Sequence, residues 1–159
     1  ARSLLAAGGK RLRARLTFFL AQTLGVPLEQ STPWALANEI LHNASLVHDD
    51  IQDRDRFRRG RPTVWAEHGV ELAISLGDHL LMKPFLLVGK IPVSAEVRLD
   101  LQGYIAETVS RMAKAQVEEY RLTVLTPDLT AKYMQVISDK TSALFELPVQ
   151  GLCRLAGLT

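Results

Sequence analysis

The sequence has few of the residues that build disulfide frameworks or cysteine-rich metal sites. Cys153 is the only cysteine among 159 residues, so both are excluded within the chain. The net charge is only +2, and the basic residues are mixed with acidic ones, which argues against a nucleic-acid partner. No apolar run has the length of a membrane-spanning helix, and no segment resembles a signal peptide. These absences favour a single cytoplasmic domain without a transmembrane segment.

Sustained alternation of apolar and polar residues, which is typical of half-buried strands, is also missing. Apolar residues instead recur at helical spacing, and Gly25, Pro27, Gly60 and Pro62 mark breaks between helical segments. Pro84 is expected to end or kink its helix, and Pro148 is expected to kink the last helix. The pattern predicts an all-α helical bundle. The expected helices cover residues 12–24, 32–53, 70–81, 94–121, 128–138 and 141–155.

The densest group of charges lies at residues 48–61, which read His-Asp-Asp-Ile-Gln-Asp-Arg-Asp-Arg-Phe-Arg-Arg-Gly-Arg. On a helix, Asp49 and Asp53 stack one turn apart and Asp50 lies beside them. Three uncompensated carboxylates repel one another, and a magnesium ion relieves this repulsion by binding one or two of them together with substrate phosphates. The alternative is a solvated charged face on which the aspartates pair with the arginines that follow. The apolar residues just before the aspartates favour the magnesium site.

Basic residues suited to phosphate groups occur in two places. Arg58 and Arg59 form a pair of the kind that binds phosphate oxygens. Lys10 and Arg13 follow Gly8-Gly9 at the start of a helix, where cations are unfavourable to the helix dipole and an anionic ligand would explain them. A solvated basic helix start remains an alternative for this second group.

Two further polar positions have ordinary structural interpretations when each is taken alone. His42 lies seven residues before the first aspartate, on the same helical face, and a lone histidine there is more often a core residue than a ligand. Lys140-Thr141 lies at a predicted junction between helices, where a lysine near one helix end and a threonine cap for the next are common.

Together, these residues form an ordered series along nearly the whole chain. The series comprises Gly8-Gly9-Lys10 with Arg13, His42, Asp49-Asp50-Ile51-Gln52-Asp53, Arg58-Arg59-Gly60 with Pro62-Thr63, Gly77-Asp78, Gln116 and Lys140-Thr141. In this order and spacing it resembles the trans-isoprenyl diphosphate synthases, the polyprenyl synthetase family. The resemblance implies a magnesium-dependent prenyltransferase of isoprenoid biosynthesis, with a helical bundle of the isoprenoid synthase type and a homodimeric assembly. Residues 1–159 would form one domain, incomplete at both ends, that holds the N-terminal half to two-thirds of the fold.

The resemblance also implies a role for each matching residue. Isopentenyl diphosphate and an allylic diphosphate would be the substrates, condensed into a longer trans-polyprenyl diphosphate. Asp49, Asp50 and Asp53 would hold magnesium on the allylic diphosphate, which Arg58 would also bind. The isopentenyl diphosphate site would consist of Lys10, Arg13, His42 and Arg59. The leaving diphosphate and the developing allylic cation would be stabilised by Lys140, Thr141 and Gln116.

Two features bear on how far this resemblance extends. Members of the family carry a second aspartate-rich motif on a later helix, and these 159 residues contain none. We therefore expect the second motif either in residues beyond this sequence or in another chain. In the family, the side chains four, five and eight residues before the first aspartate lie near the growing tail. Here they are Ser45, Ala44 and Leu41, and since none is aromatic we expect a product of geranylgeranyl length or longer.

Three other functions remain open on the sequence. A class I terpene cyclase also uses a D-D-x-x-D group, but it does not need the basic residues expected for isopentenyl diphosphate. A non-catalytic or partner subunit of a heteromeric prenyl synthase would explain the missing second motif, although the intact aspartate triad argues against it. A phosphohydrolase with histidine and aspartate ligands is suggested by His42 and His48-Asp49, but it would need further spaced ligands that the sequence does not offer.

Overall fold

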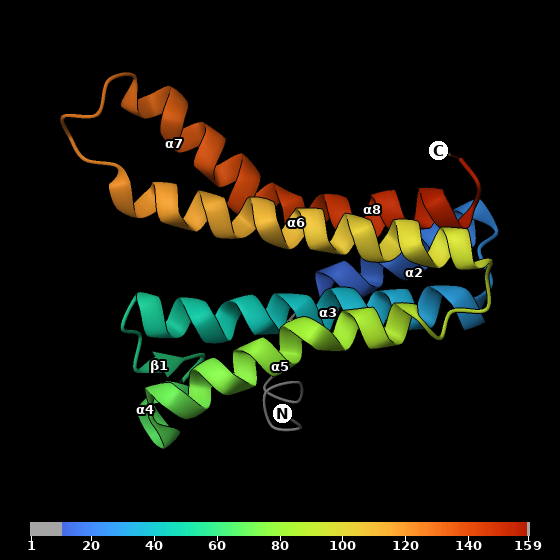
Figure 1. Cartoon of the computed structure of the whole chain (residues 1–159), viewed down its shortest axis with the longest axis horizontal. Helices are drawn as coiled ribbons and strands as arrows, with labels where there is room; N and C mark the ends of the chain where they lie inside the picture. The colour runs from blue at the N-terminus through green and yellow to red at the C-terminus, as the bar shows by residue number, and fades with distance from the viewer. Residues whose placement is uncertain (1–10, 159) are drawn as a thin grey trace.

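The computed structural model describes residues 11–158 and is helical apart from one short hairpin (Figure 1). The all-α prediction is confirmed. The predicted Lys10, with Gly8 and Gly9, lies outside the described residues. In chain order the elements are α2 (Leu12–Leu24), α3 (Leu28–Gln52), β1 (Phe57–Arg58), β2 (Arg61–Pro62), α4 (Val64–His68), α5 (Val70–Val88), α6 (Ala95–Arg121), α7 (Leu129–Ile137), the π-helical turn η1 (Ser138–Ser142) and α8 (Ala143–Leu155).

The long helices pack as two pairs, α3 with α5 and α6 with α8, and α2 contacts both α3 and α8 (Figure 1). One buried apolar cluster joins these pairs and includes Trp34, Leu41, Leu101 and Leu147. A second cluster lies between α3 and α5. Helix α7 lies at an angle to α6, at the end of the bundle where α3 finishes (Figure 1).

The end of α2 was predicted correctly, and the start of α3 was not. Gly25 adopts φ 69°, and its N–H donates to the carbonyl of Ala21, which ends α2 as the sequence suggested. We expected the next helix to start at Thr32-Pro33, but it starts at Leu28 because the N–H groups of Gln30 and Ser31 already donate to the carbonyl of Pro27. Pro33 therefore lies inside the helix.

Pro84 also lies inside a helix rather than ending it, and Pro148 lies inside α8, as the sequence suggested. Helix α5 runs on to Val88, seven residues beyond the predicted end, and Pro84 is buried within it. The predicted long helix over 94–121 is confirmed, and Ser94 caps it by accepting a hydrogen bond from the N–H of Val97.

The segment after α3 folds into a hairpin that the sequence pattern did not reveal. Phe57 pairs with Pro62 and Arg58 with Arg61, and the two residues between the strands, Arg59 and Gly60, have φ values of 53° and 74°. Two successive positive φ values are typical of the tight turn that joins antiparallel strands. Strands of two residues are too short to show a period of two, which is why this hairpin was expected only as a loop. The helix α4 was missed because its five residues are too few to show a helical repeat.

Within residues 11–158, no helix combines the length and the apolar character needed to cross a membrane.

Candidate active site

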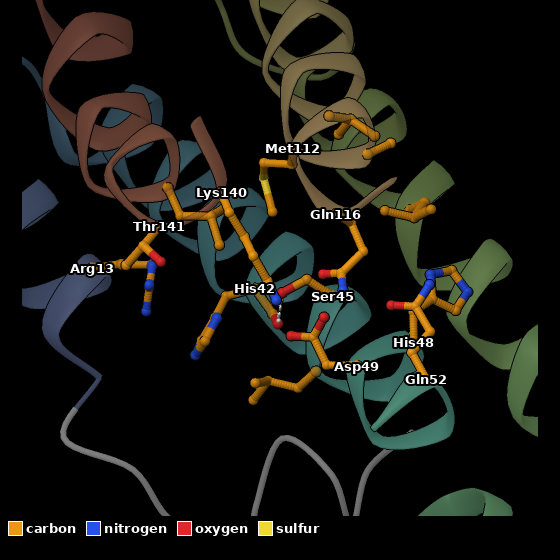
Figure 2. Close-up of a pocket in the computed structure, with 15 residues that line it drawn as sticks. Arg13, His42, Ser45, His48, Asp49, Gln52, Met112, Gln116, Lys140 and Thr141 are labelled. Atoms are coloured by element: carbon orange, nitrogen blue, oxygen red, sulfur yellow. Dashed lines mark hydrogen bonds between the residues drawn. The ribbon is translucent and has the colours of Figure 1, made fainter. Parts of the chain in front are cut away.

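A pocket of about 250 Å³ opens between α2, α3, α6, η1 and the first turn of α8, with α5 contributing one wall residue. It brings together seven of the residues that the sequence singled out, from segments up to 128 positions apart (Figure 2). These seven are Arg13, His42, Ser45, Asp49, Gln116, Lys140 and Thr141. The sequence alone therefore identified much of the lining of one cavity.

The π-helical turn η1 supplies two adjacent residues to the pocket. Because a π turn widens the helix, it changes which side chains face inward, and here both Lys140 and Thr141 line the cavity (Figure 2). The Nζ atom of Lys140 lies 2.7 Å from a carboxylate oxygen of Glu119 on α6. Burial lowers the pKa of Lys140, but this hydrogen bond and the nearby charges of Asp49, Glu119 and Asp53 outweigh burial and raise it. The lysine is therefore held protonated beside the pocket.

The first aspartate, Asp49, lies opposite this lysine at the polar end of the cavity (Figure 2). Its pKa is raised, chiefly by burial and also by the charges of Asp53 and Asp50, while Lys140 and Arg58 oppose the increase. Asp53 caps the end of α3, where its N–H donates to the carbonyl of Asp49 at 2.8 Å, and its side chain is exposed. The two residues are thus one helical turn apart, and the excess negative charge there favours a cation.

The middle aspartate is placed differently from these two. Asp50 is 4% exposed, does not line the pocket, and accepts a hydrogen bond from Nε of Arg58 at 2.5 Å. Its pKa is raised, chiefly by burial, although the hydrogen bond from Arg58 opposes the increase. Arg58, predicted to bind a diphosphate, is thus already paired with one carboxylate in this structure.

A second polar group is formed by Arg13 from α2 and His42 from α3. Nε of Arg13 and Nδ1 of His42 are buried and have no hydrogen-bond partner among the described residues. The guanidinium of Arg13 stacks over Phe145, 4.5 Å from the ring centre, which fixes its orientation. The pKa of His42 is lowered to about 4, first by burial and then by the charges of Arg13, Arg59 and Arg58. Buried donors without partners next to several positive charges suit an anionic ligand.

The remaining walls of the pocket are largely apolar, and the sequence analysis missed them. Its apolar side chains are those of Leu46, Leu81, Val109, Met112, Ala113 and Leu144. Met112 and Val109 lie one and two turns before Gln116 on α6, and this spacing could have identified them once Gln116 was chosen. His48 and Gln52 also line the cavity and were not predicted as binding residues.

The three residues expected near a growing tail occupy different environments. Ser45 lines the pocket, and its hydroxyl donates to the carbonyl of His42 at 2.9 Å. Leu41 and Ala44 are 1% and 0% exposed and pack in the two core clusters instead of lining the cavity. Arg59 lies in the turn of the hairpin, outside the pocket lining, although its charge acts on His42.

The pocket therefore has a polar end and an apolar wall, an arrangement that is chemically compatible with an anion that carries an apolar tail. Charged and hydrogen-bonding groups gather where Lys140, Asp49, Arg13 and His42 meet, and apolar side chains continue from there toward the core. Over residues 11–158, no three histidine, cysteine or acidic side chains are grouped closely enough to hold a metal ion by themselves.

Comparisons with known proteins agree with this geometry. A family model described as polyprenyl synthetase matches residues 1–159. The geranylgeranyl diphosphate synthase of Methanosarcina mazei is 33% identical over 144 residues, which cover 91% of this chain and 44% of that protein. The octaprenyl diphosphate synthase of Haemophilus influenzae is 34% identical over 153 residues, which cover 96% of this chain and 45% of that protein. The solved geranylgeranyl pyrophosphate synthetase of the archaeon Geoglobus acetivorans superposes with a TM-score of 0.91 at 29% identity, covering 99% of this chain and 52% of that one.

The chain spans about half the length of the curated relatives that it matches. The structural match extends over nearly all of its own residues, so the predicted bundle of the isoprenoid synthase type is confirmed. The relatives are named for products of different length, so these similarities do not set the product of this chain.

Proposed function

The chain belongs to the polyprenyl synthetase family, and from that premise we propose that its protein condenses isopentenyl diphosphate with an allylic diphosphate to give a longer trans-polyprenyl diphosphate. The observation that carries this proposal is the pocket, in which cationic and hydrogen-bonding groups at one end continue into an apolar wall. A prenyl diphosphate has the same division between a charged head and an apolar tail. This proposal makes the protein a prenyltransferase.

Lys140, Thr141 and Gln116 are proposed to act on the allylic substrate. The ammonium of Lys140, held protonated by Glu119, would take up charge on the departing diphosphate. The side-chain oxygens of Thr141 and Gln116 line the same cavity and would face the cation that forms as the C–O bond breaks. The double bond of isopentenyl diphosphate would then attack this cation, and the released diphosphate would accept the proton lost from the adduct.

Arg13 and His42 are proposed to bind the diphosphate of isopentenyl diphosphate, together with Lys10 and Arg59. The support is that Nε of Arg13 and Nδ1 of His42 are buried without a partner in the described part of the chain. An anion placed between them would satisfy both atoms. The pKa of His42 is lowered first by burial and then by neighbouring positive charges, and the anion would offset this second contribution.

Magnesium is the proposed cofactor, and the residues at the polar end fit it. Asp49 and Asp53 lie one helical turn apart, so their negative charges are close together. Magnesium binds through one or two carboxylates together with substrate phosphates. This mode agrees with the lack of a three-residue metal group within residues 11–158. When bound, the ion would neutralise charge on the diphosphate as it leaves.

The apolar wall is proposed to protect the reaction from water. Val109, Met112 and Leu144 line the pocket beside the polar end, and Leu144 is 5% exposed. Water that reached the allylic cation would capture it as an alcohol, so a dry wall at this point preserves the cation for the second substrate.

The direct test is incorporation of labelled isopentenyl diphosphate into extractable product by the intact protein, with allylic primers of several lengths. Lys140→Gln should lower the rate by about 100-fold or more, since it removes a charge aimed at the leaving group. Lys132→Gln, on the exposed face of α7, is the matched control and should retain the rate. Equal rates for the two variants, or no incorporation by the unaltered protein, would refute the proposal.

We further propose a product of geranylgeranyl length or longer. Ser45 is small and lines the pocket, so Ser45→Phe should fill the cavity and shorten the product. Ser110→Phe, on the exposed side of α6, provides the control. Mass spectrometry of the products distinguishes the two, and an unchanged distribution in Ser45→Phe would contradict this assignment. Ala44→Phe is less informative because Ala44 is fully buried in the core.

The protein is also proposed to be a cytoplasmic homodimer. Leu72, Met82 and Leu86 lie on one face of α5 and expose 51%, 58% and 61% of their surface, which a second copy would cover. Light scattering should give a mass twice that of one chain, and Met82→Glu should reduce it to that of a monomer. Val124→Glu, on the loop before α7, should not change the mass. A monomeric mass for the unaltered protein would rule out this assembly.

A further inference from the structure

Ion pairs join α6 to η1 and α8 at three successive levels of the bundle. The two long helices run antiparallel, side by side (Figure 1). The N···O distances are 2.7 Å for Glu119–Lys140, 2.5 Å for Arg111–Glu146 and 2.9 Å for Asp100–Arg154. The first pair lies at the pocket and the third at the far end of α8. The middle pair lies between them and has no role in the proposed chemistry.

The guanidinium of Arg111 contacts two carboxylates that flank Lys140-Thr141 in the sequence. Its Nη2 atom donates to Oε2 of Glu146 in the first turn of α8, and its Nε atom lies 3.9 Å from Oδ1 of Asp139 in η1. The pKa of Arg111 is raised, chiefly by the hydrogen bond with Glu146 and also by the charges of Glu146 and Asp139, although burial opposes the increase. One side chain of α6 therefore holds the segment on both sides of the two pocket residues.

The π turn η1 is held against α6 by two ion pairs in the described part of the chain. Asp139 pairs with Arg111, and Lys140 pairs with Glu119. Arg111 and Glu119 lie two turns apart on α6, about 12 Å along its axis, and the buried Ala115 lies midway between them. A π turn is rare and occurs mostly as a single turn inside an α-helix. We therefore expect contacts outside the turn to maintain it.

The pair between Lys140 and Glu119 does not fix the turn by itself. A lysine side chain has four rotatable bonds, so its ammonium can follow a carboxylate while the backbone that carries it shifts. The planar guanidinium of Arg111 is more rigid, and it contacts η1 and α8 together. Arg111 does not line the pocket, so it can affect the chemistry only through the residues that it holds.

We propose that Arg111 is a positioning residue: by pairing with Asp139 and Glu146, it holds the π turn against α6 so that Lys140 and Thr141 face the pocket. The inference rests on the proposed function for the roles of Lys140 and Thr141, and on the ion pairs for its geometry. A displacement of about 1 Å at a catalytic group can lower a rate by as much as about 100-fold. Loss of Arg111 should therefore lower kcat, while isopentenyl diphosphate binding, proposed for α2 and α3, should be kept.

The first experiment measures the kinetics of prenyl transfer by the intact protein at a temperature well below its Tm. Arg111→Gln should lower kcat by about tenfold and leave the KM for isopentenyl diphosphate within about twofold. Arg111→Lys keeps the charge and should restore kcat to within about threefold of the unaltered protein. An unchanged kcat in Arg111→Gln would overturn the proposal, and so would a rise in KM as large as the fall in kcat.

Two control variants on α6 separate this effect from a general loss of charge or packing. Asp100→Asn breaks the ion pair with Arg154 at the far end of α8. Arg121→Gln removes an exposed arginine that pairs with Glu118 on its own helix. Both variants should keep kcat within about 1.5-fold of the unaltered protein. If Asp100→Asn lowers kcat as much as Arg111→Gln does, the position beside the π turn has no special role and the proposal is overturned.

The second experiment measures hydrogen exchange of the intact protein without substrates, by mass spectrometry of peptides that cover residues 138–146. Arg111→Gln should accelerate exchange in these peptides by about three- to tenfold, because the turn opens more often without its support. Exchange in peptides from α5 should not change. The double variant Arg111→Gln/Glu146→Gln should exchange no faster than Arg111→Gln, since both substitutions remove the same pair. Unchanged exchange in Arg111→Gln, or additive effects in the double variant, would overturn the proposal.

Failure of the proposed function gives a different result from failure of this inference. If the unaltered protein does not incorporate isopentenyl diphosphate, the proposed function is refuted, and the exchange measurement still decides whether Arg111 holds the π turn. If the unaltered protein is active and Arg111→Gln exchanges faster with an unchanged kcat, the proposed function stands. Arg111 then contributes only to stability, and its role as a positioning residue is refuted.

Discussion

The stability of the protein should decrease as the pH falls because of His42. Substitution of this residue should remove that part of the pH dependence. The pKa of this imidazole is lowered from 6.5 to about 4, first by burial and then by three neighbouring guanidinium groups. Between these two values the unfolded chain binds a proton at His42 and the folded chain does not. Falling pH therefore favours the unfolded state over this range, and the contribution of neutral His42 is fully lost below about pH 4.

The size of the effect follows from the shift. A lowering of the pKa of His42 from 6.5 to about 4 corresponds to about 3 kcal/mol of unfolding free energy as an upper limit. His42 is only half-buried, so solvent screening reduces this value, and we expect about 1–2 kcal/mol. Burial raises the pKa values of Asp49 and Asp50, and these two groups favour the folded state as the pH falls. The total pH profile therefore mixes opposing contributions.

The comparison of two proteins isolates the histidine. Urea unfolding should be measured at pH values from 7.5 to 4.5. Over this range the free energy of unfolding of His42→Gln should decrease by about 1–2 kcal/mol less than that of the unaltered protein. His79→Gln, which removes an exposed histidine from α5, is the control and should keep the original pH dependence. If the difference in stability between the unaltered protein and His42→Gln is the same at both ends of the range, the reasoning about His42 is wrong.

Two further predictions concern the support of the site and the packing of the core. Glu119→Gln removes the carboxylate that pairs with Lys140, so burial should then lower the pKa of the lysine, and the rate of prenyl transfer should fall by about three- to tenfold with an earlier loss at alkaline pH. An unchanged pH–rate profile would contradict this role. Gly151→Ala should lower the free energy of unfolding by about 1–3 kcal/mol, because a Cβ there would lie 2.0 Å from Cζ2 of buried Trp34. Gly103→Ala should raise it by about 0.5–1 kcal/mol, because nothing lies within 4 Å of a Cβ at that position. Denaturant unfolding measures the stability of both variants. Equal effects of the two alanines would show that the contact with Trp34 does not destabilise Gly151→Ala.

Local signals in the sequence were enough to locate most helices but not all their limits. Gly25 and Ser94 have direct roles at helix ends, so those boundaries were predicted well. Pro33 and Pro84 were misread as helix boundaries because a missing N–H inside a helix can be compensated by packing. Pro84, for example, is buried within α5. The hairpin at residues 57–62 depends on two positive φ values and left no periodic pattern to detect.

The residue types and their order along the chain were enough to predict the chemical character of the site. Carboxylates spaced by one helical turn, paired arginines and Lys140-Thr141 keep the same chemical properties wherever the chain places them. Which of them meet depends on contacts between distant segments. Helix packing brings Lys140 opposite Asp49 across 91 positions, and the same packing adds Met112 to the pocket and buries Ala44 away from it. Burial and pairing also separate Asp50 from its neighbours, because identical side chains differ in environment only when the fold gives each its own surroundings.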